Sequence, residues 1–207
     1  MMFPLFRRSS RQDTIPTLYG TIVAQARLPS FYREYGVADT VNGRFDLLVV
    51  HLALVIDRLA EGPESREAGQ ALFDHFCRDM DHNLREMGIG DLSVPKEMER
   101  IGQAFYGRAQ AYRSALAADG NTALVEALHR NIYGGSPATP TAPVHLAAYI
   151  REAVRDVRTQ RETNFWPASC ACRDLKLLFS LKTKTGHQKT DFYGKKSKPL
   201  ERAGGGG

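Results

Sequence analysis

Residues 40–62 have the sequence TVNGRFDLLVVHLALVIDRLAEG, and this stretch decides the fold. From Leu47 to Ile56 its side chains are apolar on most sides of a helix, as in a helix that other helices enclose. We therefore expect it to be the central helix of the protein. His51 lies within it, and we interpret it as a hydrogen-bonded core histidine because the run supplies no partners for a ligand role.

Helical periodicity continues on both sides of the central stretch, and strand alternation is nearly absent. In the helix expected at about residues 65–87, five apolar residues recur at steps of four and three and are expected to face the core: Phe73, Cys77, Met80, Leu84 and Met87. Gly88 is expected to end this helix, and a turn then leads into a second helix, so that the two form a hairpin. The sequence predicts an all-α fold, an irregular bundle of five or six helices.

The net charge of +5 is not spread evenly along the chain. Residues 161–207 carry 10 Lys and Arg against 4 Asp and Glu, a net charge of +6, whereas residues 1–160 carry 18 against 19, a net charge of −1. We therefore divide the chain into an N-terminal extension (1–14), a helical domain (15–160) and a Lys-rich tail (161–207). The tail is expected to be disordered, and is interpreted as an appended tail, a recombined end or a misread reading frame.

The three cysteines, Cys77, Cys170 and Cys172, do not make a disulfide framework, which fits a reducing compartment. The first residues, MMFPLFRRSSRQD, lack the pattern of a secretory signal. No run reaches the roughly 18 apolar residues that a membrane-spanning helix needs. These features predict a cytoplasmic protein, or one that lies peripherally at the inner face of the membrane.

The helix expected at about residues 65–87 also carries a polar cluster, His75, Asp79, His82 and Glu86, whose spacing places the four on one face. We expect this face to point away from the apolar stripe, and interpret it as a solvated or partner-facing surface; a metal site is the weaker alternative. The chain has no His-Glu-x-x-His motif, dinucleotide loop or nucleophile elbow. The sequence therefore predicts no enzyme, no catalytic residue, no metal ligand, no cofactor and no small-molecule substrate.

Two strings in the chain suggest a family. LYGTIVAQARLPSFYREYGVADTVNGRFDLLVVHLALVIDRL begins at residue 18, and DHNLREMGIGDLSVPKEMERIGQAFYGRAQAY begins at residue 81. Together they resemble the ubiquinol–cytochrome c chaperone family, the assembly factors of respiratory complex III, over roughly residues 15–158. The resemblance implies a helical protein without known catalytic residues; mitochondrial members bind newly made cytochrome b near the ribosome exit.

The resemblance therefore implies an assembly chaperone that binds cytochrome b or an early intermediate of the ubiquinol–cytochrome c reductase complex. The dense segment around DHNLREMG then serves as a recognition signature, with Arg85, Glu86 and Asp91 as candidate partner-binding residues. Tyr106 is a further candidate because it falls off the apolar stripe that Phe105 and Tyr112 share.

An alternative function depends on charge alone. The lysines of the tail could bind ribosomal or other RNA phosphate, or anionic lipid, without sequence specificity. The candidate contacts are Lys182, Lys184, Lys195 and Lys196. This alternative predicts a ribosome- or RNA-binding protein, with no specific nucleic acid recognised.

Overall fold

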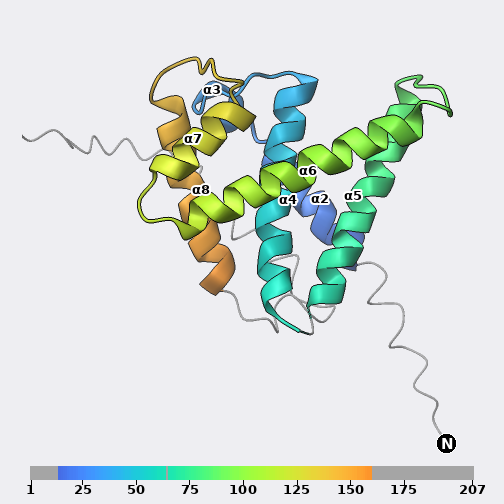
Figure 1. Cartoon of the computed structure of the whole chain (residues 1–207), viewed down its shortest axis with the longest axis horizontal. Helices are drawn as coiled ribbons and strands as arrows, with labels where there is room; N and C mark the ends of the chain where they lie inside the picture. The colour runs from blue at the N-terminus through green and yellow to red at the C-terminus, as the bar shows by residue number, and fades with distance from the viewer. Residues whose placement is uncertain (1–13, 64, 160–207) are drawn as a thin grey trace, which may run out of the picture.

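The computed structural model describes residues 14–63 and 65–159, and within these ranges it contains helices and no strand. The helices are α2 (Thr14–Ala26), α3 (Pro29–Arg33), α4 (Val41–Glu61), α5 (Arg66–Glu86), α6 (Val94–Ala117), α7 (Thr122–Asn131) and α8 (Ala142–Thr159). Six of them have ten or more residues, and α3 is a single short turn of five. The predicted all-α bundle is confirmed (Figure 1).

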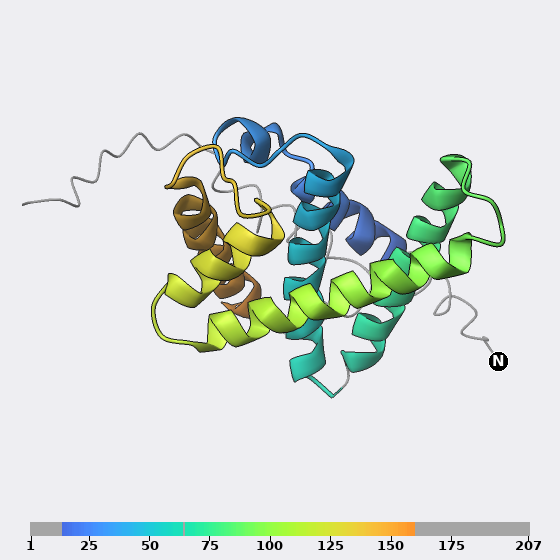
Figure 2. The same ribbon diagram turned by 45° about the horizontal axis from the view of Figure 1, so that its top comes forward.

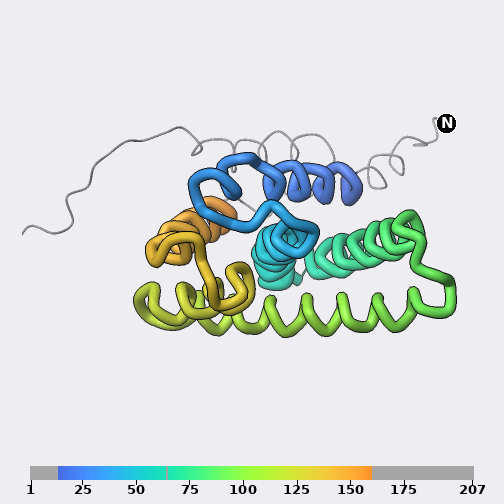
Figure 3. The backbone as a smooth tube through the Cα atoms, turned by 90° about the horizontal axis from the view of Figure 1, so that it is seen from above, coloured from blue at the N-terminus to red at the C-terminus, as the bar shows by residue number. Residues whose placement is uncertain are grey.

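The central position of α4 is also confirmed. It packs against α2, α5, α6 and α8, and seen from above α2 and α3 lie on one side of it while α6 crosses the other side (Figure 3). Its residues from Leu47 to Val55 are all buried. At its start the side chain of Thr40 accepts a hydrogen bond of 3.1 Å from the Gly43 amide. A Cβ at Gly43 would lie 2.0 Å from the carbonyl oxygen of Ala38, so only glycine fits this tight helix entry.

His51 is a hydrogen-bonded core histidine, as expected, and it joins three helices. Its Nδ1 lies 2.7 Å from the Leu47 carbonyl oxygen, which can only accept, so Nδ1 carries the proton. Its Nε2 therefore accepts from the hydroxyl of Tyr149 in α8 at 2.9 Å. The same hydroxyl accepts from Gln25 Nε2 in α2 at 3.1 Å. Burial lowers the pKa of His51 to about 4, against the hydrogen bond to Leu47, so the ring is neutral at pH 7.

The hairpin of α5 and α6 is confirmed, and its tip projects beyond the rest of the helices (Figure 1). After α5 the chain turns at Gly88, whose φ of +82° lies in the left-handed region that glycine adopts without strain. Ser93 and Pro95 then begin α6, without a capping hydrogen bond from the serine side chain. The string LREMGIGDLSVPKEM therefore forms the tip and both helix ends that support it.

The expected core-facing stripe of α5 was right for Leu84, which is buried, and for Phe73, Cys77 and Met80, which pack against the core, but it was off-centre and wrong for Met87. Leu72, Phe76 and Leu84 are buried, whereas Phe73, Cys77 and Met80 are half-buried and Met87 is 61% exposed. The reason is that α5 contacts α2, α4 and α6 at once. A helix with three neighbours buries a wide part of its circumference. The spacing of apolar residues at three and four positions shows that one side is buried, but it does not show where the centre of that side lies.

The polar face of α5 was also partly misread. We expected it to point to solvent or a partner, but its first half packs on α2. The hydroxyl of Tyr19 donates to Asp79 Oδ2 at 2.6 Å, and the Tyr19 ring meets the His75 ring edge-on at 4.9 Å between centroids. Only the second half, His82 and Glu86, is exposed.

Candidate functional site

A wide, open groove lies between the start of α4 and the hairpin of α5 and α6. It has a volume of about 1020 Å³ and is lined by the second half of α2, the start of α4, the end of α5, the first half of α6 and the end of α7. Figure 2 shows the start of α4 between the end of α7 and the projecting hairpin, with α6 along one side. Small-molecule pockets enclose most of their ligand, whereas this groove is open to solvent along its length, a shape that also admits an extended occupant.

The lining of the groove is largely apolar. Side chains from different helices contribute to it: Val23, Phe45, Leu48, Met80, Leu84, Ile101 and Ile132. At its edges two large apolar side chains are open to solvent, Val41 with 73% and Met87 with 61% of their surface exposed. Apolar side chains gathered at one hollow are typical of a protein-binding surface.

An ion pair between a half-buried arginine and a buried aspartate lies in the groove wall. Arg108 Nη2 of α6 lies 2.8 Å from Asp46 Oδ1 of α4, a contact without hydrogen-bond geometry, and the guanidinium lies 5.6 Å from the centroid of the Phe45 ring. Burial raises the pKa of Asp46 to about 6, although the charge of Arg108 opposes that rise. The pair therefore links α4 to α6 at the cost of a partly desolvated carboxylate.

The predicted partner-binding residues Arg85, Glu86 and Asp91 lie together at the hairpin tip. Arg85 Nε binds Asp81 Oδ2 at 2.8 Å, and its Nη1 also pairs with Asp91 across the turn. Glu86 Oε1 lies 3.1 Å from His82 Nε2, and Glu86 also lines the groove. Leu92, at the end of the tip, is 99% exposed.

Tyr106 lies apart from these residues and does not line the groove. It is 60% exposed, as its place off the apolar stripe predicted, and its ring lies 5.2 Å from that of Phe73 on α5. Three of the four predicted residues of the helical domain are thus brought together, and the fourth is on another surface. Lys182, Lys184, Lys195 and Lys196 lie outside the described residues.

Comparison with known proteins gives a clear result. Residues 33–169 match the model of the family described as ubiquinol-cytochrome C chaperone, which is more than half of the chain. This chain belongs to the ubiquinol-cytochrome C chaperone family. The family match continues past the last described helix, α8, into the segment that the charge pattern assigned to the tail.

A solved structure supports the same assignment of this ubiquinol-cytochrome C chaperone. The crystal structure of the Cbp3 homolog from Brucella abortus is similar with a TM-score of 0.69 and 38% sequence identity, over 79% of this chain and 91% of that chain. No curated protein matches the chain. The family of complex III assembly chaperones that the sequence motifs indicated is therefore confirmed.

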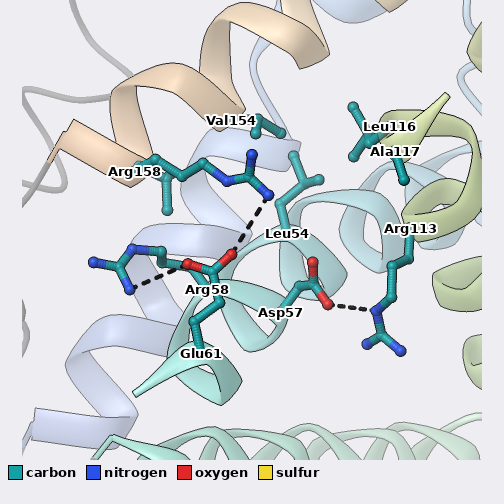
Figure 4. Close-up of a pocket in the computed structure, with 10 residues that line it drawn as sticks. Leu54, Asp57, Arg58, Glu61, Arg113, Leu116, Ala117, Val154 and Arg158 are labelled. Atoms are coloured by element: carbon teal, nitrogen blue, oxygen red, sulfur yellow. Dashed lines mark hydrogen bonds and ion pairs between the residues drawn. The ribbon is translucent and has the colours of Figure 1, made fainter. Parts of the chain in front are cut away.

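A second, smaller pocket of about 140 Å³ lies where the ends of α4, α6 and α8 meet (Figure 4). Two ion pairs join the three helices there. Arg113 Nε lies 2.5 Å from Asp57 Oδ1, and Arg158 Nη2 lies 3.4 Å from Glu61 Oε1. The charged side chains at this pocket pair with one another across the helices, so we interpret the pocket as part of the helix packing and not as a binding site.

Two further observations limit the chemistry of the described residues. Within residues 14–63 and 65–159, no group of three or more His, Cys, Asp or Glu side chains is arranged to hold a metal ion. Among the same residues, no helix is long and apolar enough to cross a membrane. Sequence reasoning missed the groove itself, although Glu86 and Met87 of the signature lie on it.

Proposed function

We propose that this chain is a chaperone that holds newly made cytochrome b, or an early intermediate of the ubiquinol–cytochrome c reductase complex, until assembly proceeds. Membership of the ubiquinol-cytochrome C chaperone family supports a client that belongs to this complex. The observation that carries the mode of binding is the open groove with its apolar lining. An α-helix with its side chains is about 10–12 Å wide, and helix-in-groove docking is a common way to recognise one.

In this proposal the groove covers an apolar face of a client helix before that helix reaches its final partners. Burial of the client against Val41 and Met87 would remove two exposed apolar side chains from water as well. The groove is assembled from folded helices and is open before the client arrives, so little ordering of the chaperone opposes binding.

Complementation of a deletion strain tests this function. Deleting the gene is expected to remove the haem absorbance of cytochrome b from membranes, and the unaltered gene is expected to restore it. Val41→Asp combined with Met87→Asp is expected to fail in restoring it, because two carboxylates would then have to be desolvated at the groove. Both positions are exposed, so the fold is expected to persist.

Val144→Asp provides the matched control. Val144 is an exposed apolar residue near the start of α8, as Val41 is at the start of α4, but it does not line the groove. It is expected to restore the haem signal fully. Normal cytochrome b in the deletion strain, in the absence of a redundant factor, would contradict the function; full rescue by the double variant would contradict the groove.

A further inference from the structure

The charges around the groove are distributed unequally between its two ends. At the end formed by α4, α2 and α7 the charged lining residues are Arg27, Arg44 and Arg130. At the end formed by the hairpin they are Glu86, Glu97 and Arg100. Between them the charges of Asp46 and Arg108 cancel in their ion pair.

At the arginine end, Arg27 and Arg130 are available to bind an anionic group of a client. Arg44 is paired with Asp39 at 2.7 Å, but among the described residues neither Arg27 nor Arg130 makes an ion pair. Burial raises the pKa of the Tyr32 hydroxyl, and Arg44 and Arg27 both oppose that rise, so the two arginines lie within Coulombic reach of one group. Arg130 enters from the end of α7, which is fixed to the chain before α4 by the Tyr133 hydroxyl donating to Tyr35 O at 2.7 Å.

The hairpin end has the opposite sign. Arg100 Nη1 pairs with Glu97 Oε1 at 2.6 Å, and the ion-pair contact of Glu86 within residues 14–63 and 65–159 is with the imidazole of His82. An apolar groove with a cationic end and an anionic end can distinguish the two directions of a bound helix.

We propose that the groove selects a client helix with carboxylate side chains at one end, and binds it with that end beside Arg27 and Arg130. This inference rests on the proposed function and specifies its client: an apolar helical segment flanked by Asp or Glu. A segment flanked by Lys or Arg at both ends would place a cation beside the guanidinium groups of Arg27 and Arg130 and is rejected. The charges fix the direction of the helix, and the apolar lining supplies the affinity.

Three synthetic peptides test the selection. Each is an amidated and acetylated helical peptide with one shared apolar core, followed at one end by two Glu, two Gln or two Lys, and labelled with fluorescein. Fluorescence anisotropy with the full chain is expected to give the lowest Kd for the Glu peptide and the highest for the Lys peptide, with about threefold to tenfold between successive peptides. Raising the salt concentration is expected to shrink these differences.

A pair of double variants separates the groove from the overall positive charge of the chain. Arg27→Gln/Arg130→Gln is expected to bring the Glu and Gln peptides within about twofold of each other. Arg33→Gln/Arg155→Gln removes the same net charge from exposed residues outside the groove and is expected to keep the full preference. If the preference survives the first variant, or disappears in both, the inference is overturned.

A photo-cross-linking residue placed beside the Glu pair reports the direction of binding. Cross-links are expected at the arginine end, at Val41, Asn42 and Gly134, and not at Met87 of the hairpin end. Equal cross-linking at both ends would overturn the inference while leaving the proposed function intact. If none of the three peptides binds, the groove is not the client site, and the proposed mode of binding fails together with this inference.

Discussion

His51 and Asp46 lie on the same helix, α4, yet one belongs to a sealed part of the molecule and the other to an open part. His51 is 1% exposed, and both of its ring nitrogens have hydrogen-bond partners. Asp46 is buried in the wall of the groove and has an ion pair without hydrogen-bond geometry. The difference teaches that one helix can serve two environments: around His51 it is enclosed on all sides, whereas the stretch before it borders the open groove, where we propose that a client binds.

The largest expected effect on stability is that of Phe31→Ala, in the enclosed part of the molecule around His51. Phe31 is fully buried, and its ring contacts those of Tyr35, His51 and Tyr149 at centroid distances of 5.1–5.5 Å. We expect a loss of about 3–5 kcal/mol in the free energy of unfolding, because a cavity would open in the sealed part. Urea unfolding followed by circular dichroism measures this loss. A cost below about 1 kcal/mol would mean that the sealed part is not the main source of stability.

A smaller loss is expected for His51→Leu, about 2 kcal/mol at pH 7, because Tyr149 and Leu47 lose a buried partner. The pKa of folded His51 is about 4, below its ordinary 6.5. The folded protein therefore resists a proton that the unfolded chain accepts, and stability is lost as the pH falls from about 6.5 towards 4. Unfolding measured at several pH values should show this loss in the unaltered protein and a weaker one in His51→Leu. An equal slope in both would refute the role given to His51.

The contribution of Asp46 to the free energy of unfolding should depend on pH in the direction opposite to that of His51, and Asp46→Asn tests this. Folded Asp46 has a pKa of about 6, above its ordinary 3.8, so its contribution is fully present below pH 3.8 and is lost as the pH rises through 6. The variant is expected to match the unaltered protein near pH 4 and to exceed it by about 1 kcal/mol at pH 7.5, a value reduced for the solvent that reaches the groove. Unfolding at pH 4.5, 6 and 7.5 measures the gain. A loss at pH 7.5 would show that the pair with Arg108 stabilises the fold.

Leu92→Ser is expected to have the smallest effect. Leu92 is 99% exposed at the hairpin tip, so its removal should change the free energy of unfolding by less than about 0.5 kcal/mol. The same variant should bind the groove peptides as the unaltered protein does, since Leu92 does not line the groove. Thermal unfolding and peptide anisotropy check the two statements. A clear loss of stability would place the tip within the packed structure.

Local features of the fold could be predicted from the sequence because their causes are local. The all-round apolar run from Leu47 to Ile56 identified the central helix, and Gly88 identified the hairpin turn. Tyr106 was predicted to be exposed from its place on α6 alone, and it is. The family could likewise be recognised from contiguous strings, which need no structure to read.

The buried sector of α5 and the groove could not be predicted in this way. Which side of α5 is buried depends on α2, which ends 40 residues before α5 begins and covers His75 and Asp79. The groove collects short pieces of five helices, and the signature segment supplies only one of them, so the others could not be found from the signature.

The sequence by itself determined the helical class, the central helix, the hairpin and the family, because hydrophobic periodicity and glycine conformation act over a few neighbouring residues. Only the tertiary structure decided the neutral state of His51, the ion pair of Asp46 and the uneven charge of the groove. Burial and Coulombic interactions depend on distances in space, and residues such as Arg27 and Arg130 come to share one surface only when the helices pack.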